Sequence, residues 1–410
     1  MNDTYLNGPI NYMKLYNKEK NKYLYVFMDW HESIEYQQKC DSLHSIDVDK
    51  YLFHILEEAN INIDFFLEIY PTTINNDTKN SNNNYIYIHA LMEKFKKLYS
   101  NLEIKKKKNI RLHYIDVRAY TYYDNIQNSI FLCINNFTRI NPYNMNQLIF
   151  NINSIFNQIF YLLDTVTKIK NKEENIEEKY KIKINLIKKA AEINTNLSYQ
   201  EIEDNATFQI LKKILTKYEN NINKENINNF FQIEYINKLS YLLTYINKFL
   251  IKLKDIQILV NYYYNEKKIV IKKPNPKSNI NILNEKSYYF IPNEKNIRKE
   301  IIKELEKINI IIITLGVILV DCFFLRRFVD KSYIKNAIVY TGASHSCTYI
   351  WFLIKFYNYK ITEYDYLKNI TIDKLYEIIL SSNNPFEIEE YLFPDNFKQC
   401  VHLKKKLFEK

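Results

Sequence analysis

The chain has 410 residues, of which 47% are hydrophobic and 15% aromatic. This is enough for one large or two ordinary domains with a real core, and it excludes a wholly disordered chain. The formal net charge is +10, but Asn, Lys, Ile and Tyr, which are abundant, all have A/T-rich codons. We therefore interpret the lysine excess as the bias of an AT-rich genome. No segment combines a Lys/Arg stripe with interleaved aromatic residues, which argues against nucleic acid as a partner.

Cysteine usage indicates the redox environment. The five cysteines are scattered, odd in number and contain no C-x-x-C pair; they are Cys40, Cys133, Cys322, Cys347 and Cys400. This distribution argues against a disulfide framework and against a cysteine zinc site. Residues 1–10 carry no basic-then-apolar pattern, so no signal peptide is expected. A reducing, intracellular compartment fits best.

Strand and helix patterns alternate over the first 120 residues. Residues 23–28 (YLYVFM) form a compact apolar run rich in aromatic residues, which predicts a buried strand. Similar runs at 62–68 and 110–117 predict two more strands. Helical periodicity appears between them, at 46–59 and 85–98. Strands separated by helices predict an α/β fold with a mainly parallel sheet that is flanked by helices.

The middle third of the chain is predicted to be helical. Residues 144–163 are apolar-rich, residues 167–193 carry mixed charges four positions apart, and residues 226–259 have long helical periodicity. The segment 272–277 (KKPNPK) breaks helices and marks the exit from this region. We therefore expect a helical insert within the α/β fold.

These patterns predict three segments. The first and last, 1–143 and 266–410, are expected to be the two halves of the α/β core, and 144–265 the helical insert. In the last segment, a long helix at 299–328 is followed by a strand at 337–341 and a helix at 347–356.

The apolar run 308–325 resembles a membrane span in length. It contains Asn309, Thr314 and Asp321, and a charge inside a span is costly. We therefore predict a buried helix of the protein core, just before the strand at 337–341, and no membrane partner. The neighbouring Arg326 or Arg327 is expected to reach a carboxylate of the site described next.

Ionisable residues follow each predicted core strand. They are Asp29 and His31 after the first, Glu68 at the end of the second, Asp116 and Arg118 after the third, and His345 after the strand at 337–341. Because parallel strands end at one edge of a sheet, where ligands bind, we expect these side chains to share one site. His113 lies within a strand and is expected to be a packed residue.

Two chemistries suit this set of residues. Asp29, His31 and His345 would be the ligands of a divalent metal. The alternative is metal-free acid–base catalysis, in which a carboxylate orients a histidine base. Glu68 and Asp116 would bind the metal or orient the imidazoles. Arg118 would stabilise an anionic intermediate or hold Glu68.

Glycine is nearly absent, with only Gly8, Gly316 and Gly342 in the chain. These three allow no G-x-G-x-x-G, no P-loop and no G-x-S-x-G motif. A glycine retained in such a chain, as at Gly342, indicates a positive φ or a close backbone approach. We place His345 in a loop after Gly342, where it would make few core contacts.

Four short motifs support a family resemblance. They are an acid-x-His at 29–31, Phe-Leu-Glu at 66–68, His-Tyr-x-Asp-x-Arg at 113–118 and Gly-x-x-His-x-x-x-Tyr at 342–349. This set resembles the superfamily of the TIKI proteases, erythromycin esterases, ChaN-type haem-binding proteins and TraB-like proteins. It also resembles uncharacterised proteins of large nucleocytoplasmic DNA viruses.

The resemblance implies an intracellular viral protein, in the host cytoplasm or the virion, with a hydrolase-like site that acts on an unknown substrate. The first motif of the superfamily commonly has the sequence Gly-Glu-x-His, whereas this chain has Met28-Asp29-Trp30-His31. The lost glycine and shorter acid favour an alternative, a catalytically inactive virion or host-interaction protein on the same fold.

Overall fold

The computed structural model describes residues 4–69, 86–100, 109–171, 199–267, 293–396 and 398–408. Contacts between residues divide the chain into two units. The first comprises Met1–Val117, Lys217–Ile227 and Val320–Lys410 and is called the α/β unit here. The second comprises Arg118–Thr216 and Asn228–Leu319 and is called the helical unit. The predicted boundaries at 143 and 265 stay a prediction.

The α/β unit is built on a six-stranded sheet. Its order is β6 (Ile110–Tyr114), β5 (Ile63–Leu67), β7 (Asn336–Gly342), β3 (Lys22–Asp29), β2 (Asn11–Asn17) and β8 (Lys360–Tyr364). The first four strands are parallel to one another, whereas β2 pairs antiparallel with both β3 and β8. The sheet is thus mixed, and the expected mainly parallel sheet is not established.

The predicted elements around this sheet are present. The strands expected at 23–28, 62–68, 110–117 and 337–341 correspond to β3, β5, β6 and β7. The helices α1 (Val48–Glu58), α2 (Tyr87–Ser100) and α10 (Ala343–Tyr357) follow strands of one sheet or the other. Helix α1 buries one face, which includes Leu52, Ile55 and Leu56, because apolar residues recur there at helical spacing.

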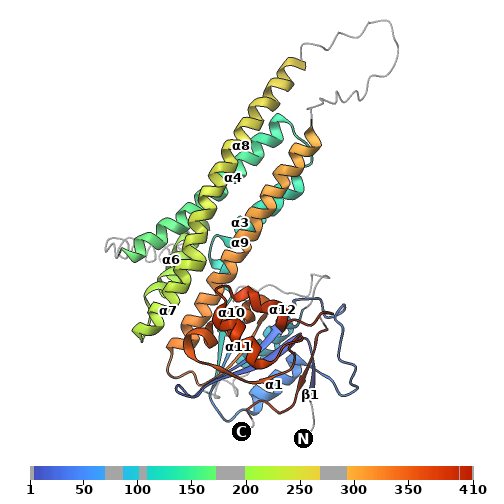
Figure 1. The fold of residues 1–410 in the computed structure, drawn as a ribbon, viewed down its shortest axis with the longest axis vertical. Coiled ribbons are helices and arrows are strands. Elements are labelled where there is room, and N and C mark those ends of the chain that lie inside the picture. Colours follow the sequence, from blue (N-terminus) through green and yellow to red (C-terminus); the bar gives the residue numbers. More distant parts are fainter. Residues whose placement is uncertain are drawn as a thin grey trace. The chain divides into compact units, whose positions relative to one another are not determined.

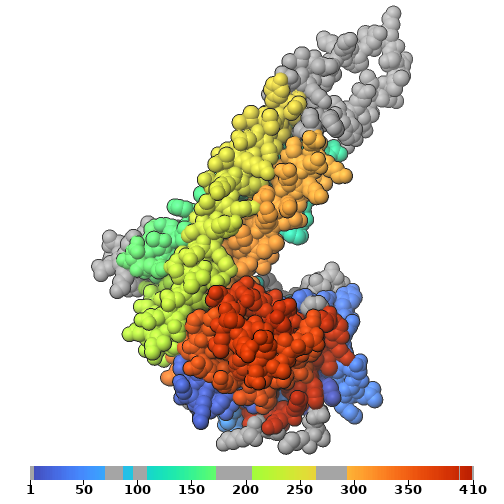
Figure 2. All heavy atoms as spheres, in the orientation of Figure 1, coloured from blue at the N-terminus to red at the C-terminus, as the bar shows by residue number. Residues whose placement is uncertain are grey.

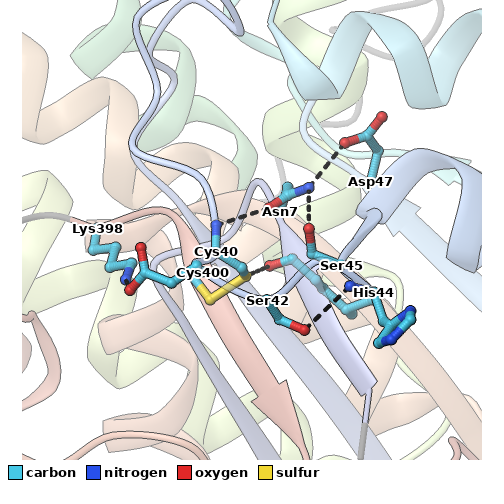
Figure 3. Close-up of a disulfide and its surroundings, with 10 residues drawn as sticks. Asn7, Cys40, Ser42, His44, Ser45, Asp47, Lys398 and Cys400 are labelled. Carbon is cyan, nitrogen blue, oxygen red and sulfur yellow. Dashed lines mark hydrogen bonds and ion pairs between the residues drawn. A yellow bond between two sulfur atoms is a disulfide. The ribbon is translucent and has the colours of Figure 1, made fainter.

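A second, three-stranded sheet has the order β4 (Ile46–Asp47), β1 (Thr4–Asn7) and β9 (Cys400–Leu403). Beside it, Cys40 and Cys400 form a disulfide (Figure 3). The backbone N–H of Cys40 also donates to Oδ1 of Asn7 at 2.9 Å. The cysteine pattern argued against a disulfide framework and gave no indication of this single bond, because it depends on tertiary structure: β9 pairs with β1, and this long-range pairing brings together cysteines 360 positions apart.

The C-terminal part of the chain completes the α/β unit. It adds α11 (Ile372–Ser381), η6 (Pro385–Ile388) and α12 (Glu389–Leu392), all of which pack against α10. In Figure 2 these segments, drawn in red, cover one face of this unit. Helix α10 is consequently almost fully buried.

The helical unit contains η4 (Arg118–Tyr120), α3 (Tyr123–Asn136), α4 (Pro142–Lys170), α6 (Tyr199–Thr216), η5 (Gln232–Ile236) and α8 (Asn237–Lys267). Helix α7 (Asn221–Phe231) crosses between the two units. Helix α4 packs against α3, α6 and α8 (Figure 1). Of the predicted segments, residues 172–193 and 272–277 lie outside the described residues.

Helix α9 (Glu294–Asp330) contains the whole apolar run 308–325 and directly precedes β7, as predicted. Among the described residues, it is the one helix long and apolar enough to cross a membrane, and 61% of its apolar window is buried inside the protein. A buried core helix has the same properties. The predicted arginine contact is not seen for Arg326, whose Nη1 donates to the backbone oxygen of Lys217 at 3.2 Å.

Candidate functional site

The parallel strands bring their carboxyl ends to one edge of the large sheet. In the register of β3 with β7, Asp29 lies opposite Gly342. In the register of β5 with β7, Leu67 lies opposite Tyr340, and the next residue, Glu68, donates its backbone N–H to the Tyr340 oxygen at 3.2 Å. The side chains that follow these strands therefore meet at this edge.

Five side chains form one chain of contacts there, which we call the acid–histidine network. Nδ1 of His31 lies 3.0 Å from Oδ2 of Asp29, and Nε2 of His31 lies 3.4 Å from Oε2 of Glu68. On the other side of Glu68, Oε1 lies 3.0 Å from Nε2 of His345. Nδ1 of His345 in turn lies 2.6 Å from Oδ1 of Asp321. Glu68 thus stands between two aspartate–histidine pairs.

The sequence did not single out Asp321 for this site. Asp321 lies in α9, and its side chain is completely buried. The signal was present, because Asp321 is the one charged residue in the apolar run 308–325. A charge in the core needs a partner, and its partner here is His345.

Glu68 is held firmly at the centre of the network. Its Oε2 accepts hydrogen bonds from Oγ1 of Thr341 at 2.8 Å and from the backbone N–H of Gly342 at 2.7 Å. Its side chain is 4% exposed. Burial alone would raise the pKa of Glu68, but the charge of His345 and the contacts with both histidines hold it well below its usual value.

Both histidines are shifted toward the protonated form. Burial lowers the pKa of His31, but hydrogen bonds with Asp29 and Glu68 outweigh it and raise the pKa to about 10. For His345, burial again lowers the pKa, whereas the charges of Glu68 and Asp321 raise it to about 10. Burial raises the pKa of Asp321. At neutral pH both imidazoles are therefore hydrogen-bond donors.

Exposure distinguishes the two histidines. The side chain of His31 is 35% exposed, whereas that of His345 is 5% exposed and those of Asp29 and Asp321 are fully buried. His31 also has φ = +57°, which is uncommon for any residue other than glycine. Of the five side chains, His31 is the one that solvent or a substrate can readily reach.

The network does not fit a divalent metal. A histidine ligand needs one unprotonated ring nitrogen directed at the ion, but both nitrogens of His31 and of His345 face carboxylates. In the part of the chain that the structure describes, no group of three or more His, Cys, Asp or Glu side chains is arranged to hold a metal ion. The predicted ligand set of Asp29, His31 and His345 thus lacks support from the geometry.

The roles predicted for Asp116 and Arg118 stay predictions. Asp116 is buried just after β6, and Ile115 before it donates its N–H to the Leu67 oxygen at 3.0 Å, which places this segment beside the end of β5. Its role stays a prediction. Arg118 begins η4 in the helical unit and packs against Gly316 there. His113 is a packed residue as predicted, stacked on Phe66.

The structure excludes one of the two alternatives given for Gly342, and it contradicts the expectation about His345. Gly342 has φ = −55°, a value that any residue adopts. The correct reason for glycine is the alternative, close approach, because a Cβ there would lie 3.0 Å from Nε2 of His31 and 3.3 Å from Oε2 of Glu68. His345 lies in the first turn of α10, since this helix begins at Ala343 and not at residue 347.

Gly342→Ala is therefore expected to push His31 away from Glu68. The added methyl group should cost about 1–3 kcal/mol of the free energy of unfolding, as overpacking does, and lower the pKa of His31. Urea denaturation and histidine NMR titration measure both effects. Gly316→Ala is the control, because its Cβ meets other atoms only at 3.4 Å or more. A Gly342→Ala protein with unchanged stability and unchanged His31 titration would contradict the close-approach explanation.

The fold and the site define a mixed α/β protein with a helical unit and a buried network of alternating carboxylates and imidazoles. Residues 4–408 match DUF5847, a family of unknown function, and the chain belongs to this family. Relatives occur in Acanthamoeba polyphaga mimivirus. Uncharacterised proteins R706 and R161 are each 30% identical to this chain, over 97% and 96% of it and 95% of their own length. Uncharacterised protein R160 is 29% identical over 96% of the chain.

These similarities confirm the predicted closeness to proteins of a large DNA virus and identify the chain as a viral protein of unknown function. No solved structure matches the chain. The resemblance to the TIKI, erythromycin esterase, ChaN and TraB superfamily, and the location in host cytoplasm or virion, stay predictions.

Proposed function

We propose that this protein is a metal-independent hydrolase in which His31 exchanges protons with the substrate. The observation that carries the proposal is the exposure of His31: it is the one exposed member of an otherwise buried acid–histidine network. A catalytic acid or base needs both contact with the substrate and a partner that orients its ring. Asp29 supplies that orientation through Nδ1.

The proposed role of His31 is that of a general acid. With its pKa raised to about 10, the imidazole carries a proton at neutral pH. Its contact with Glu68 through Nε2 is, at 3.4 Å, the longest in the network, and hydrogen bonds weaken at this distance. Nε2–H is therefore the group that can turn to a substrate while Glu68 remains in place. It would protonate the leaving group of an ester or amide as water adds to the carbonyl carbon and the C–O or C–N bond breaks, and the proton that the water releases would restore the imidazolium.

The superfamily resemblance supports the same class of reaction, since it includes both proteases and esterases. Within this proposal Glu68 and His345 position His31 and do not touch the substrate. Asp116 keeps its proposed place at the rim of the site. Arg118 belongs to the helical unit, so we assign it no step.

A second function is favoured by one observation. All four ring nitrogens of His31 and His345 already face carboxylates, and such a satisfied, buried network is also a means of fixing a unique core. Together with the Met28 and Asp29 departures, this supports a virion or host-interaction protein that kept the fold without chemistry.

The test is hydrolysis of a p-nitroanilide amide, whose leaving nitrogen must be protonated, by the purified protein in the presence of EDTA. We expect His31→Asn to abolish turnover, and asparagine is chosen because it tolerates positive φ. His54→Asn is the control, since His54 is an exposed histidine of α1. The proposal would be contradicted if the His31→Asn protein turned over the substrate as fast as the native protein. It would also be contradicted if EDTA abolished turnover by the native protein. Absence of turnover by the native protein would favour the non-catalytic function.

A further inference from the structure

We infer that Asp321 is a positioning residue of the site: it holds His345 behind Glu68 so that Glu68 stays ionised and directed at His31. The inference rests on the proposed function for its catalytic meaning, but its structural content can be tested separately. It assigns a role to a residue of helix α9, whereas the other four residues of the network lie at or just after the ends of strands of the sheet.

The geometry of the Asp321–His345 pair carries this inference. The distance of 2.6 Å between Oδ1 and Nδ1 is the shortest in the network, as expected for a charge-assisted hydrogen bond. Both side chains are at least 95% buried. A carboxylate that accepts a hydrogen bond from one nitrogen of an imidazole fixes the orientation of the ring and favours its protonated form, in which the other nitrogen also donates. Here that other nitrogen, Nε2, lies 3.0 Å from Oε1 of Glu68.

The consequence reaches His31 through Glu68. Oε1 of Glu68 faces His345, and Oε2 faces His31, Thr341 and Gly342. If His345 turned away, Oε1 would lose this charged donor, which is costly for a buried carboxylate. Glu68 would then take up a proton or move. Asp29 contacts Nδ1 of His31 as Asp321 contacts Nδ1 of His345, so the network has a buried aspartate at each end.

The other groups that face this pair do not replace Asp321. Thr348 and Tyr349 of α10 lie beside the Asp321 carboxylate, and the Tyr349 ring lies against the His345 ring with centroids 6.4 Å apart. Both are neutral groups that can donate to Asp321. The charge that holds Nδ1 of His345 therefore comes from Asp321.

The test compares Asp321→Asn with Asp330→Asn. Asp330 is a second buried aspartate of α9, and it accepts backbone hydrogen bonds from Glu219 and Asn220 without contacting the network. By NMR titration we expect Asp321→Asn to lower the pKa of His345 by about 1–3 units, the size of a lost charge partner. Asp330→Asn should leave it unchanged. An unchanged His345 in Asp321→Asn, or an equal shift in both proteins, would overturn the inference.

A measurement on the native protein covers the case in which Asp321→Asn does not fold. The Nδ1 proton of His345 should give a far-downfield resonance that exchanges slowly with solvent, unlike that of the exposed His54. Rapid exchange would overturn the inference. On the p-nitroanilide amide, Asp321→Asn should lower kcat and leave KM unchanged. If His345 behaves as expected but the native protein hydrolyses nothing, the proposed function fails and the positioning role stands.

Discussion

Glu68→Gln should destabilise the protein by about 3–5 kcal/mol, the usual cost of removing one partner from a buried ionic network. Glutamine has nearly the same shape, so packing is preserved and the effect reports the charge. The amide nitrogen replaces one of the two carboxylate oxygens, so its N–H groups face a donor on either side: His345 in one orientation, or His31, Thr341 and the Gly342 backbone in the other. Urea denaturation at pH 7 measures the loss.

The same substitution should change how stability depends on pH. In the native protein the pKa of both His31 and His345 is raised to about 10 from 6.5. A raised histidine pKa contributes stability that is fully present below pH 6.5 and is lost as pH rises through 10. Glu68→Gln should flatten this decline. Glu234→Gln is the control, because Glu234 is a buried glutamate of the helical unit paired with Lys238. A Glu68→Gln protein as stable as the native one, with an unchanged pH profile, would contradict the account of the network.

Replacing Cys400 with serine should cost about 2–5 kcal/mol, the range found when a native disulfide is removed. The bond joins segments 360 positions apart, so it strongly reduces the conformational entropy of the unfolded chain. Thermal unfolding with and without a thiol reductant measures the effect. Reductant should lower the midpoint of the native protein to that of Cys400→Ser and leave the variant unchanged.

Cys133→Ala serves as the control for this experiment, because Cys133 is a buried free cysteine of the helical unit. Its protein should keep the sensitivity to reductant. Thiol titration of the unfolded native protein should count three thiols, from Cys133, Cys322 and Cys347. Five thiols in freshly purified protein, together with an unfolding midpoint that ignores reductant, would show that the disulfide does not form.

The sequence was informative where apolar runs are strong. The strands β3, β5 and β7 are almost entirely buried, so their composition stands out, and the polar residue after each can be placed at one edge. This reasoning predicted one site for all the ionisable residues after the strands, and four of them, Asp29, His31, Glu68 and His345, contact one another in the structure. Asp321 could not be found in the same way, because it approaches from a helix that precedes β7 and its contact with His345 depends on tertiary packing.

The antiparallel half of the sheet was missed for a related reason. Strand β8 has the short, half-exposed pattern KITEY, and β2 carries Lys14 among its apolar residues. Neither forms an apolar run. The start of α10 was also missed, because Gly342 and Ser344 look like a loop in sequence. In the structure Gly342 caps the helix and its N–H binds Glu68.

The disulfide described above closes most of the polypeptide into a covalent ring. Cys40 lies in the segment after β3, and Cys400 begins β9, so the whole helical unit lies between them in sequence. A protease that cuts the backbone once anywhere in that unit opens the ring but releases no fragment. The nicked molecule would migrate as one species on a denaturing gel without reductant and separate into two pieces only when thiols are added. Limited proteolysis of this protein has to be followed under both conditions.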